Sequence, residues 1–503
     1  MKVLVANPPA YLYDYNRRYI QGGSRWSHSD LISQDDAIHS FKNGRFLYTP
    51  FPFFLAYAAS HIEDICNLYF FDGVVLNYNE MDFKKRVAEI KPDLLVLEAP
   101  TVSFDLILRL IRDLKRDLDF KVAIVGFHIT ARFREELLLH PEIDFALINE
   151  FEYSLHELVK NDLDPTMIKG IAFVDQTHEL IYNGSSKIEK DLTKFKFPYR
   201  DDSAIYYDDL TIIGHPNIQM LTSRGCPVGC NFCYTTTFYE NSQYRARNPE
   251  DVANEINYLK DRFHPKQFYF DDDTISINQK HITDLCNYFI KENLDIQWTC
   301  MADITIKKEN LELMKKAGCV GLKFGVESID PKILKTMHKG IITENKTMQF
   351  RNMLKSLNIW GHATFSLGHP GDSYETMKNT LKFIEKLNPD SLQVSCATPL
   401  PGTKFYENAK DNKWLRIDNF NDFDGKKGSV LNYPQLDSKS IDEMYIEFLE
   451  KWEGMKKNPV RKFNGVWKKK GIVIEKLTLD KKHYNKLYSR LRDEELTKTW
   501  SVP

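Results

Sequence analysis

An alternation of short apolar strands and helical patterns runs through most of the chain and constrains its fold more than any other feature. In the first third, each predicted strand ends in a turn that contains glycine, proline or a polar residue, and a helical pattern usually follows. The predicted strands there are 2–6, 67–71, 93–97, 121–125 and 144–148, and the helices are 53–62, 83–90 and 104–114. This alternation favours a doubly wound parallel sheet, whose ligands bind at the carboxyl ends of its strands.

A second series of six strand–helix units follows a small predicted hairpin at 171–174 and 180–183. Its strands are predicted at 219–222, 267–271, 297–301, 320–326, 362–367 and 392–397. The helix that starts at Pro249 has a strong signal, because Asn248 can cap it and proline suits the first turn. Parallel barrels also place their chemistry at the carboxyl ends of strands.

Composition limits the classes of protein to which the chain can belong. Its 503 residues suggest two to four domains, and 13% aromatic residues argue against disorder. The formal net charge of −2 excludes a globally basic nucleic-acid-binding protein. No apolar run approaches the ~20 residues needed to cross a bilayer, and the start reads as a strand and turn rather than a signal peptide. We expect a protein of the reducing cytoplasm.

Three of the eight cysteines fall in one short loop directly after the first strand of the second series. Cys226, Cys230 and Cys233 are grouped, whereas the other five cysteines are isolated in the sequence. Thiolates at this density usually hold a metal centre. Zinc would need a fourth protein ligand, and no further cysteine or histidine is near. A cubane iron–sulfur cluster on three cysteines would instead leave one iron open, and a structural zinc loop remains the alternative.

The run from Cys226 to Cys233 resembles the signature of the radical S-adenosylmethionine (SAM) enzymes, which carries an aromatic residue, here Phe232, before the last cysteine. The preceding residues 222–225 resemble the cobalamin-dependent branch of that superfamily. The resemblance covers roughly residues 2–414 and implies a [4Fe–4S] cluster, SAM and cobalamin as cofactors. It implies a Rossmann-like doubly wound cobalamin-binding domain (1–186), a linker (187–210), a partial (β/α)6 radical SAM barrel (211–414) and a small, mostly helical capping segment (415–503).

The resemblance assigns SAM to the remaining strand ends of the barrel. Asp271 or Asp272 could pair with the ammonium group or the ribose hydroxyls of SAM, although aspartate also caps helices well. Further residues of the family's turns, together with the aromatic residues beside the last cysteine, complete the SAM candidates. They are Phe232, Tyr234, Gly368 and Pro399.

Glu327 and Ser328 match the family's Gly-x-Glu-Ser motif, whose polar pair lies near SAM. A buried glutamate without a partner is costly, so a ligand or a salt bridge must satisfy Glu327. Arg351 or Lys323 would be its simplest protein partner.

The cobalamin candidates lie at the strand ends of the first domain. They are Asn7, Pro8, Pro9, Thr101, Gly126, His128 and Glu150. A structural hydrogen bond would explain His128 as well as a cofactor contact would. The chain departs from the family where Val125 or Phe127 stands in place of a second glycine, and where Asn149 and Phe151 stand in a turn that usually holds glycines. It also lacks the Asp-x-His-x-x-Gly motif of other cobalamin proteins. A Rossmann-like scaffold without a ligand is the alternative.

The implied activity is the methylation of an unactivated carbon. General acid–base catalysis cannot activate an inert C–H bond, so the cofactors carry the chemistry and the protein positions them. In the family, the cluster reduces SAM to a 5′-deoxyadenosyl radical that takes a hydrogen atom from the substrate, and cobalamin carries the methyl group. The expected partners are a small-molecule or natural-product substrate and an electron donor such as flavodoxin or ferredoxin, with no membrane span and no nucleic acid.

Three other activities were weighed. A radical cyclisation or rearrangement without methyl transfer is the second enzymatic reading, and a cobalamin or iron–sulfur sensor is the non-catalytic one. An RNA methylthiotransferase is rejected because only Cys66 lies in the first domain, where that class carries additional cluster cysteines. After residue 414 we expect an amphipathic helix at 441–452 and a segment that closes the barrel's open side. The lysines at 468–470 read as a solvated face.

Overall fold

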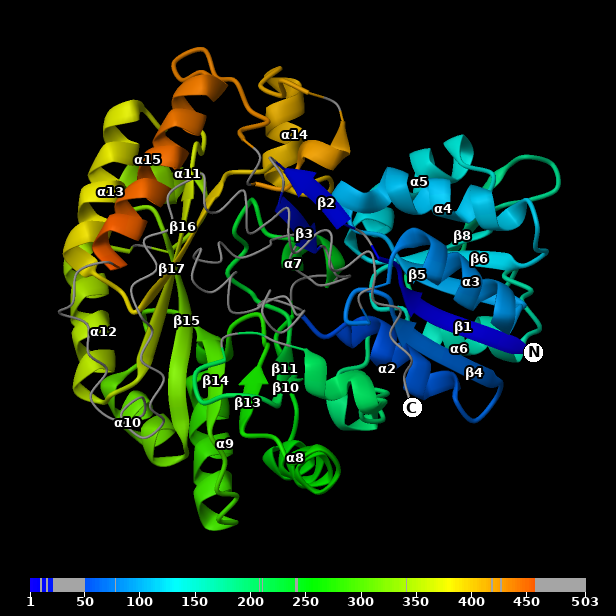
Figure 1. The fold of residues 1–503 in the computed structure, drawn as a ribbon, viewed down its shortest axis with the longest axis horizontal. Helices are drawn as coiled ribbons and strands as arrows, with labels where there is room; N and C mark the ends of the chain where they lie inside the picture. The colour runs from blue at the N-terminus through cyan, green and yellow to red at the C-terminus, as the bar shows by residue number, and fades with distance from the viewer. Residues whose placement is uncertain are drawn as a thin grey trace, which may run out of the picture. The chain divides into compact units, whose positions relative to one another are not determined.

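Two sheets of mainly parallel strands organise the protein (Figure 1), which is represented by a computed structural model. The structure describes residues 1–9, 11–14, 17–20, 50–76, 78–207, 209, 211–239, 243–340, 342–417, 419–425 and 428–456. One sheet has seven strands and the other has six. The α/β fold class expected from the sequence is confirmed at this level.

The seven-stranded sheet has the order β4-β1-β5-β6-β7-β8-β9. Its strands are β1 (Lys2–Asn7), β4 (Asn67–Asp72), β5 (Leu94–Glu98), β6 (Lys121–Val125), β7 (Phe145–Leu147), β8 (Ile171–Val174) and β9 (Leu180–Tyr182). The first five strands are parallel, and the predicted hairpin adds β8 and β9 antiparallel. Strand β1 pairs with both β4 and β5, so the strand order reverses beside β1. Such a switch point is where open α/β sheets bind ligands.

Helices cover both faces of this sheet, as a doubly wound arrangement requires. Helices α2 (Phe53–Ile62) and α6 (Glu152–Lys160) share a core with one face. The other face packs on α3 (Glu80–Ile90), α4 (Phe104–Lys115) and α5 (Phe127–Leu139). Helix α3 begins before the predicted residue 83, because Asn79 and Asp82 each accept a hydrogen bond from the other's backbone N–H in a capping box.

The six-stranded sheet is parallel throughout and follows the order of the chain. Its strands are β10 (Asn217–Met220), β13 (Gln267–Phe270), β14 (Trp298–Ala302), β15 (Cys319–Glu327), β16 (Trp360–Leu367) and β17 (Ser391–Cys396). Each overlaps the strand predicted from the sequence, so these six predictions are confirmed. Among the described residues no ladder joins β10 to β17, and the sheet therefore stays open.

Helices connect the successive strands of this second sheet. They are α8 (Pro249–Phe263), α9 (Gln279–Lys291), α10 (Lys308–Lys316), α11 (Pro331–Thr336), α12 (Glu344–Ser356) and α13 (Tyr374–Leu387), and α14 (Lys404–Asp411) follows the last strand. Asn248 caps α8 by accepting a hydrogen bond from the backbone N–H of Glu250, which confirms the predicted start. Helix α15 (Ser438–Lys456) contains the predicted helix 441–452 and packs on α13 and β17. The lysines at 468–470 lie outside the described residues.

Two of the connecting segments contain regular structure. Strands β2 (Tyr11–Asp14) and β3 (Arg17–Ile20) pair antiparallel after β1, and residues 21–49 lie outside the described part of the chain. In the predicted linker, Arg200 is buried with its guanidinium 4.0 Å from the centre of the Phe51 ring. The short helices η2 (Leu192–Lys194) and η3 (Asp202–Tyr206) also lie in this segment, so it packs on the protein as it crosses.

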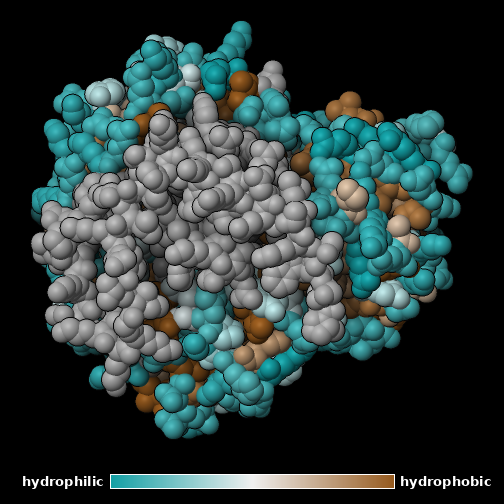
Figure 2. Space-filling view, in the orientation of Figure 1, coloured by the Kyte–Doolittle hydropathy of each residue, from teal (hydrophilic) through white to brown (hydrophobic). Residues whose placement is uncertain are grey.

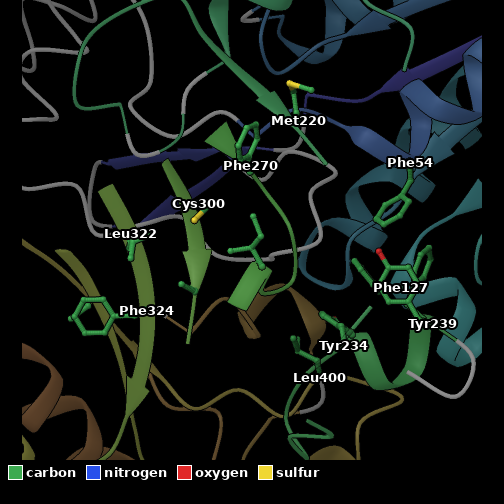
Figure 3. Close-up of a cluster of buried hydrophobic side chains, with 14 of the residues drawn as sticks. Phe54, Phe127, Met220, Tyr234, Tyr239, Phe270, Cys300, Leu322, Phe324 and Leu400 are labelled. Atoms are coloured by element: carbon green, nitrogen blue, oxygen red, sulfur yellow. The ribbon is translucent and has the colours of Figure 1, made fainter. Parts of the chain in front are cut away.

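An aromatic core joins α2 and α5 to the short helix α7 (Thr235–Phe238), which follows the cysteines (Figure 3). The rings of Phe127 and Tyr234 stack with their centres 4.7 Å apart, and Phe54 and Tyr239 pack in the same cluster. Phe151 belongs to this core and is fully buried. Phe127 and Phe151 therefore both contribute to packing.

No helix in the described ranges is both long and apolar enough to span a membrane. In the face shown in Figure 2, hydrophilic residues dominate the described surface and apolar residues are scattered between them. Scattered apolar residues are normal on a folded domain and need no special function.

Candidate active site

The loop that carries the three cysteines leaves the carboxyl end of β10 and has a fixed backbone. Residues just before it form β11 (Ser223–Arg224), which pairs antiparallel with β12 (Arg245–Ala246). Gly225 has a φ angle of 89°, and a Cβ atom there would lie 2.1 Å from the carbonyl oxygen of Gln243. Only glycine fits this position, so Cys226 starts from a defined point beside the neighbouring strand.

The three cysteines of this loop are half-buried and form no disulfide. Burial raises the pKa of Cys226 to about 12 and that of Cys230 to about 11, and the negative charges of the other loop thiolates add to both rises. The Thr235 hydroxyl lies 3.1 Å from the Cys233 sulfur. Thiols with these pKa values hold their protons until a metal displaces them.

The donor set of the loop fits an iron–sulfur cluster better than a single metal ion. Among the described residues, no three histidine, cysteine, aspartate or glutamate side chains converge closely enough to chelate one ion. A structural zinc site needs four such ligands. Three thiols in a loop, without a fourth protein ligand, match a cluster that keeps one iron free of protein.

Asp272, a predicted SAM contact, holds the beginning of the cysteine loop. Its carboxylate accepts hydrogen bonds from the backbone N–H groups of Thr222 at 2.6 Å and Ser223 at 3.1 Å, and from the Ser223 hydroxyl at 2.7 Å. Asp273 accepts a hydrogen bond from the backbone N–H of Gly225 at 2.8 Å. These two carboxylates position the loop, and the predicted contact of the neighbouring, buried Asp271 with SAM stays a prediction.

Glu327 pairs with Lys339, and neither Arg351 nor Lys323 is its salt-bridge partner, so that prediction was wrong. The Lys339 ammonium lies 3.1 Å from Glu327 Oε1. Arg351 instead donates a hydrogen bond to the backbone carbonyl of Asn388, and Lys323 forms an ion pair with Asp209.

Lys339 is the functional candidate that sequence reasoning missed. It lies twelve positions beyond Glu327 in a segment without periodicity, so only the fold brings the two together. Its positive charge also lowers the pKa of Cys230, against the larger effect of burial. A partly buried ammonium group thus stands beside the cysteine loop. Ser328, the other residue of the predicted pair, is buried, and its hydroxyl accepts a hydrogen bond from the backbone N–H of Asp330.

The turn after β16 touches the cysteine loop through aromatic rings. The His369 ring lies edge-on to Phe232 with ring centres 5.6 Å apart and stacks on Phe405 at 5.7 Å. Gly368 is closely packed, since a Cβ atom there would lie 2.9 Å from the Ile441 side chain of α15. Phe232 is therefore held by protein contacts, and Pro399 is buried after β17.

Two cobalamin candidates form a hydrogen-bonded chain with Tyr234, the residue that follows the last cysteine. The Thr101 hydroxyl lies 2.9 Å from the Tyr234 hydroxyl and 3.2 Å from His128 Nδ1. His128 is fully buried against Phe104, and burial lowers the pKa of its imidazole. Both candidates are thus engaged by protein contacts, and a cofactor role for either stays a prediction.

Glu150, a third cobalamin candidate, belongs to a buried cluster of charges that we call the arginine cluster: Arg224, Arg245, Glu150 and Glu152. Glu150 Oε1 accepts a hydrogen bond from Arg224, and its Oε2 lies 2.7 Å from Arg245. Arg224 also binds Glu152 at 2.7 Å. The cluster ties the turn after β7 to the residues directly before the cysteine loop, so Glu150 positions that loop.

The remaining cobalamin candidates lie at the carboxyl edge of the seven-stranded sheet. Asn7 ends β1 and donates a hydrogen bond to Asp72, the last residue of β4, at 3.0 Å. Pro8 and Pro9 follow Asn7, and Gly126 follows β6 with a φ angle of 105°. From the sequence, Asp72 and its neighbour at the same edge, Glu98, are predicted only as strand ends, among the turns where a ligand of this sheet would bind.

Comparison with known proteins shows which superfamily the second series of strands and helices resembles. A sequence model of the radical SAM superfamily matches residues 220–384. The chain is 29% identical over 413 residues to an uncharacterized methyltransferase, PH0819, of Pyrococcus horikoshii, covering 79% of this chain and 87% of that one. It is 24% identical over 375 residues to the anaerobic magnesium-protoporphyrin IX monomethyl ester cyclase of Rubrivivax gelatinosus, covering 72% of this chain and 66% of the relative.

The fold is similar to that of a solved structure, the radical S-adenosylmethionine methyltransferase TsrM from Kitasatospora setae with cobalamin and a [4Fe–4S] cluster bound. The match has a TM-score of 0.61 at 16% identity and covers 73% of this chain and 76% of that one. At this identity the likeness is one of fold. It includes far more of the chain than the 165 residues that the superfamily model spans.

Proposed function

We propose that this chain, whose residues 220–384 match the radical SAM superfamily, is an enzyme that cleaves SAM reductively and, with cobalamin, methylates an unactivated carbon of a small-molecule or natural-product substrate. The observation that carries this function is the group of three half-buried cysteines in one loop after the carboxyl end of β10. When bound, a [4Fe–4S] cluster supplies the electron that cleaves SAM, and cobalamin supplies the methyl transfer.

Different residues in and around the loop would hold the cluster and SAM. Cys226, Cys230 and Cys233 would hold the cluster. Glu327 and Lys339 present one carboxylate and one ammonium group beside Cys230. That pair complements the ammonium and carboxylate of the methionine part of SAM, which suits the binding of its charged end next to an open iron.

The domain boundaries follow from the same proposal. Residues 1–186 would bind cobalamin at the switch point of their doubly wound sheet, and 187–210 would connect them to the barrel at 211–414. Residues 415–503 would cap the barrel. A cluster with an open iron requires a reducing compartment, so we place the enzyme in the cytoplasm with flavodoxin or ferredoxin as the electron donor.

The decisive experiment is anaerobic reconstitution of the full chain with iron, sulfide and hydroxocobalamin, followed by incubation with SAM and dithionite. We expect about four irons for each chain, cobalamin absorbance bands and 5′-deoxyadenosine as a product. Methyl transfer adds S-adenosylhomocysteine when the substrate is supplied. A fully loaded protein that leaves SAM intact would be a sensor and would contradict the proposal.

Radical cyclisation is the second candidate, favoured by the similarity to the cyclase of Rubrivivax gelatinosus. It predicts 5′-deoxyadenosine without S-adenosylhomocysteine and without a methylated product. The ratio of these two products therefore separates the two functions.

A further inference from the structure

The carboxyl edge of the seven-stranded sheet brings four residues from four adjacent strands side by side. Asp72 ends β4, Asn7 ends β1, Glu98 ends β5 and Gly126 directly follows β6. The sheet order β4-β1-β5-β6 makes these strands neighbours, and the switch point lies between β1 and β5. Glu98 therefore stands at the place where a ligand of this sheet would bind.

Glu98 differs from the other polar groups of this edge because part of its side chain is unsatisfied. It is only 2% exposed, and its Oε2 atom has no hydrogen-bond partner in the described part of the chain. Asp72, by contrast, accepts hydrogen bonds from Asn7 at 3.0 Å, from the backbone N–H of Val74 at 2.8 Å and from the Tyr207 hydroxyl at 3.1 Å. A buried carboxyl oxygen without a partner calls for an explanation such as a ligand.

The charge state of Glu98 follows from its surroundings. Burial raises the pKa of Glu98 well above its ordinary value, and the nearby Asp72 carboxylate raises it further. This shift favours the protonated carboxyl, a form with one O–H to donate and a carbonyl oxygen to accept.

The backbone around Glu98 leaves it room. A Cβ atom on Gly126 would lie 3.0 Å from Glu98 Cγ, and the φ angle of 105° at Gly126 already disfavours any other residue. The glycine that resembles the family's turn thus accommodates the glutamate side chain in this protein.

The chemistry of the edge restricts the ligand that Glu98 can meet. Pro8 and Pro9 after β1 have no N–H groups, so this turn cannot cradle a phosphate in the way that a glycine-rich turn does. The Asp72 side chain beside them would also repel an anion. A neutral group with both a hydrogen-bond acceptor and a donor fits better, and an amide is such a group.

We propose that Glu98 forms a hydrogen bond with an amide of a corrinoid bound at this edge and so positions the corrin ring. The inference rests on the proposed function, because the corrin periphery of cobalamin carries several neutral amides. Glu98 acts as a positioning residue, and the cobalt itself is not its ligand.

The test compares Glu98→Leu with the conservative Glu98→Gln in the full chain, titrated anaerobically with hydroxocobalamin. We expect Glu98→Leu to weaken binding at least tenfold, while the melting temperature of its cobalamin-free form stays equal to the wild type or rises. Binding and stability respond in opposite directions because leucine removes a buried carboxyl that has no partner in the cobalamin-free protein and gains one only from the bound ligand. Glu98→Gln keeps a donor and an acceptor, so binding stays within about threefold.

Three results overturn the inference. If the wild type and Glu98→Leu bind hydroxocobalamin with equal affinity, Glu98 forms no hydrogen bond with the corrinoid. The proposed function is unaffected by that result. Altered cobalt absorbance bands in the Glu98→Gln complex would make Glu98 a metal ligand instead. A wild type that fails to bind hydroxocobalamin overturns the cobalamin part of the proposed function as well. If Glu98→Leu does not fold by circular dichroism, Glu98→Met is the second apolar variant and the same expectations apply.

Discussion

The two parallel sheets end in carboxyl edges of different character. At the edge of the six-stranded sheet, Asp272 binds Thr222 and Ser223, and Glu327 binds Lys339. At the edge of the seven-stranded sheet, Glu98 keeps a buried oxygen without a partner in the described residues. At the first edge Asp272 and Glu327 are bound by groups of their own chain, whereas at the second edge one oxygen of Glu98 is not.

This difference separates two ways of preparing a site. A loop whose carboxylates are already bound has its backbone and side chains fixed before a cofactor arrives, which suits a cluster that needs its three thiols in one geometry. An unsatisfied buried carboxyl instead lowers the stability of the empty protein and strengthens binding of whatever satisfies it. Four variants test the contrast, from the largest expected effect to the smallest.

Cys230→Ala should abolish reductive cleavage of SAM, because two thiolates cannot hold a cluster with a single open iron. The measurement is 5′-deoxyadenosine formation together with the iron content after reconstitution. Cys66→Ala is the matched control, since Cys66 is also half-buried and free but lies outside the loop. Substantial cleavage of SAM by Cys230→Ala would show that this loop does not hold the cluster that cleaves SAM.

Arg224→Met should destabilise the protein by about 3–5 kcal/mol, the usual result of breaking a buried ion pair. It leaves Glu152, which is 1% exposed, without its arginine, and leaves Glu150 with Arg245 alone. Denaturant unfolding of the cluster-free protein measures the loss.

The matched control for Arg224→Met is Arg86→Met, which removes an arginine from an exposed pair with Glu89 and should change little. If the two variants unfold at the same denaturant concentration, the arginine cluster does not hold the first sheet to the cysteine loop.

Lys339→Met should cost about 1–3 kcal/mol, because the pair is only partly buried, with side chains 12% and 14% exposed, and the Thr364 hydroxyl still donates a hydrogen bond to Glu327. Adding Glu327→Gln to this variant should restore part of the stability, since no unpaired carboxylate is then left. SAM binding should weaken in both variants.

Lys386→Met is the control for Lys339→Met, because Lys386 pairs with Glu344 at the surface. An additive double variant with unchanged affinity for SAM would show that the Glu327–Lys339 pair is incidental to the edge.

The sequence predicted the parts of this contrast that depend on local pattern. Strand ends followed from buried apolar runs that stop at proline, glycine or aspartate, and the start of α8 followed from Asn248 and Pro249. The three cysteines stood out because thiols are rare and their spacing is short. The capping box of Asn79 and Asp82 was also readable, although the helix was predicted to start later.

The partners of the charged residues could not be predicted, because they depend on contacts between distant segments. Glu327 meets Lys339 only after the chain passes through α11, and Glu150, after β7, meets Arg224 of β11. Glu98 reads in the sequence as an ordinary strand end. Its unsatisfied oxygen is a property of what surrounds it in three dimensions, and no residue type or spacing signals such an absence.

Tyr234→Phe should have the smallest effect, about 0.5–1.5 kcal/mol, because it removes one hydroxyl from a buried hydrogen-bonded chain and keeps the ring. The stacking of this ring on Phe127 is retained, so only the bond to Thr101 is lost. Urea unfolding of the cluster-free protein measures the change. Tyr78→Phe is the control, since its ring packs on Phe71 and no hydrogen bond of its hydroxyl is found among the described residues.

Tyr234→Phe also tests whether the carboxyl edges of the two sheets are coupled. Thr101 lies directly beyond the seven-stranded edge, and Tyr234 directly follows the last cysteine. If their bond couples the edges, Tyr234→Phe should raise the amount of 5′-deoxyadenosine formed per methyl group transferred, because the radical step would then run without its partner step. A Tyr234→Phe enzyme with the stability and the product ratio of Tyr78→Phe would mean that the two edges act independently and that the aromatic core alone holds them.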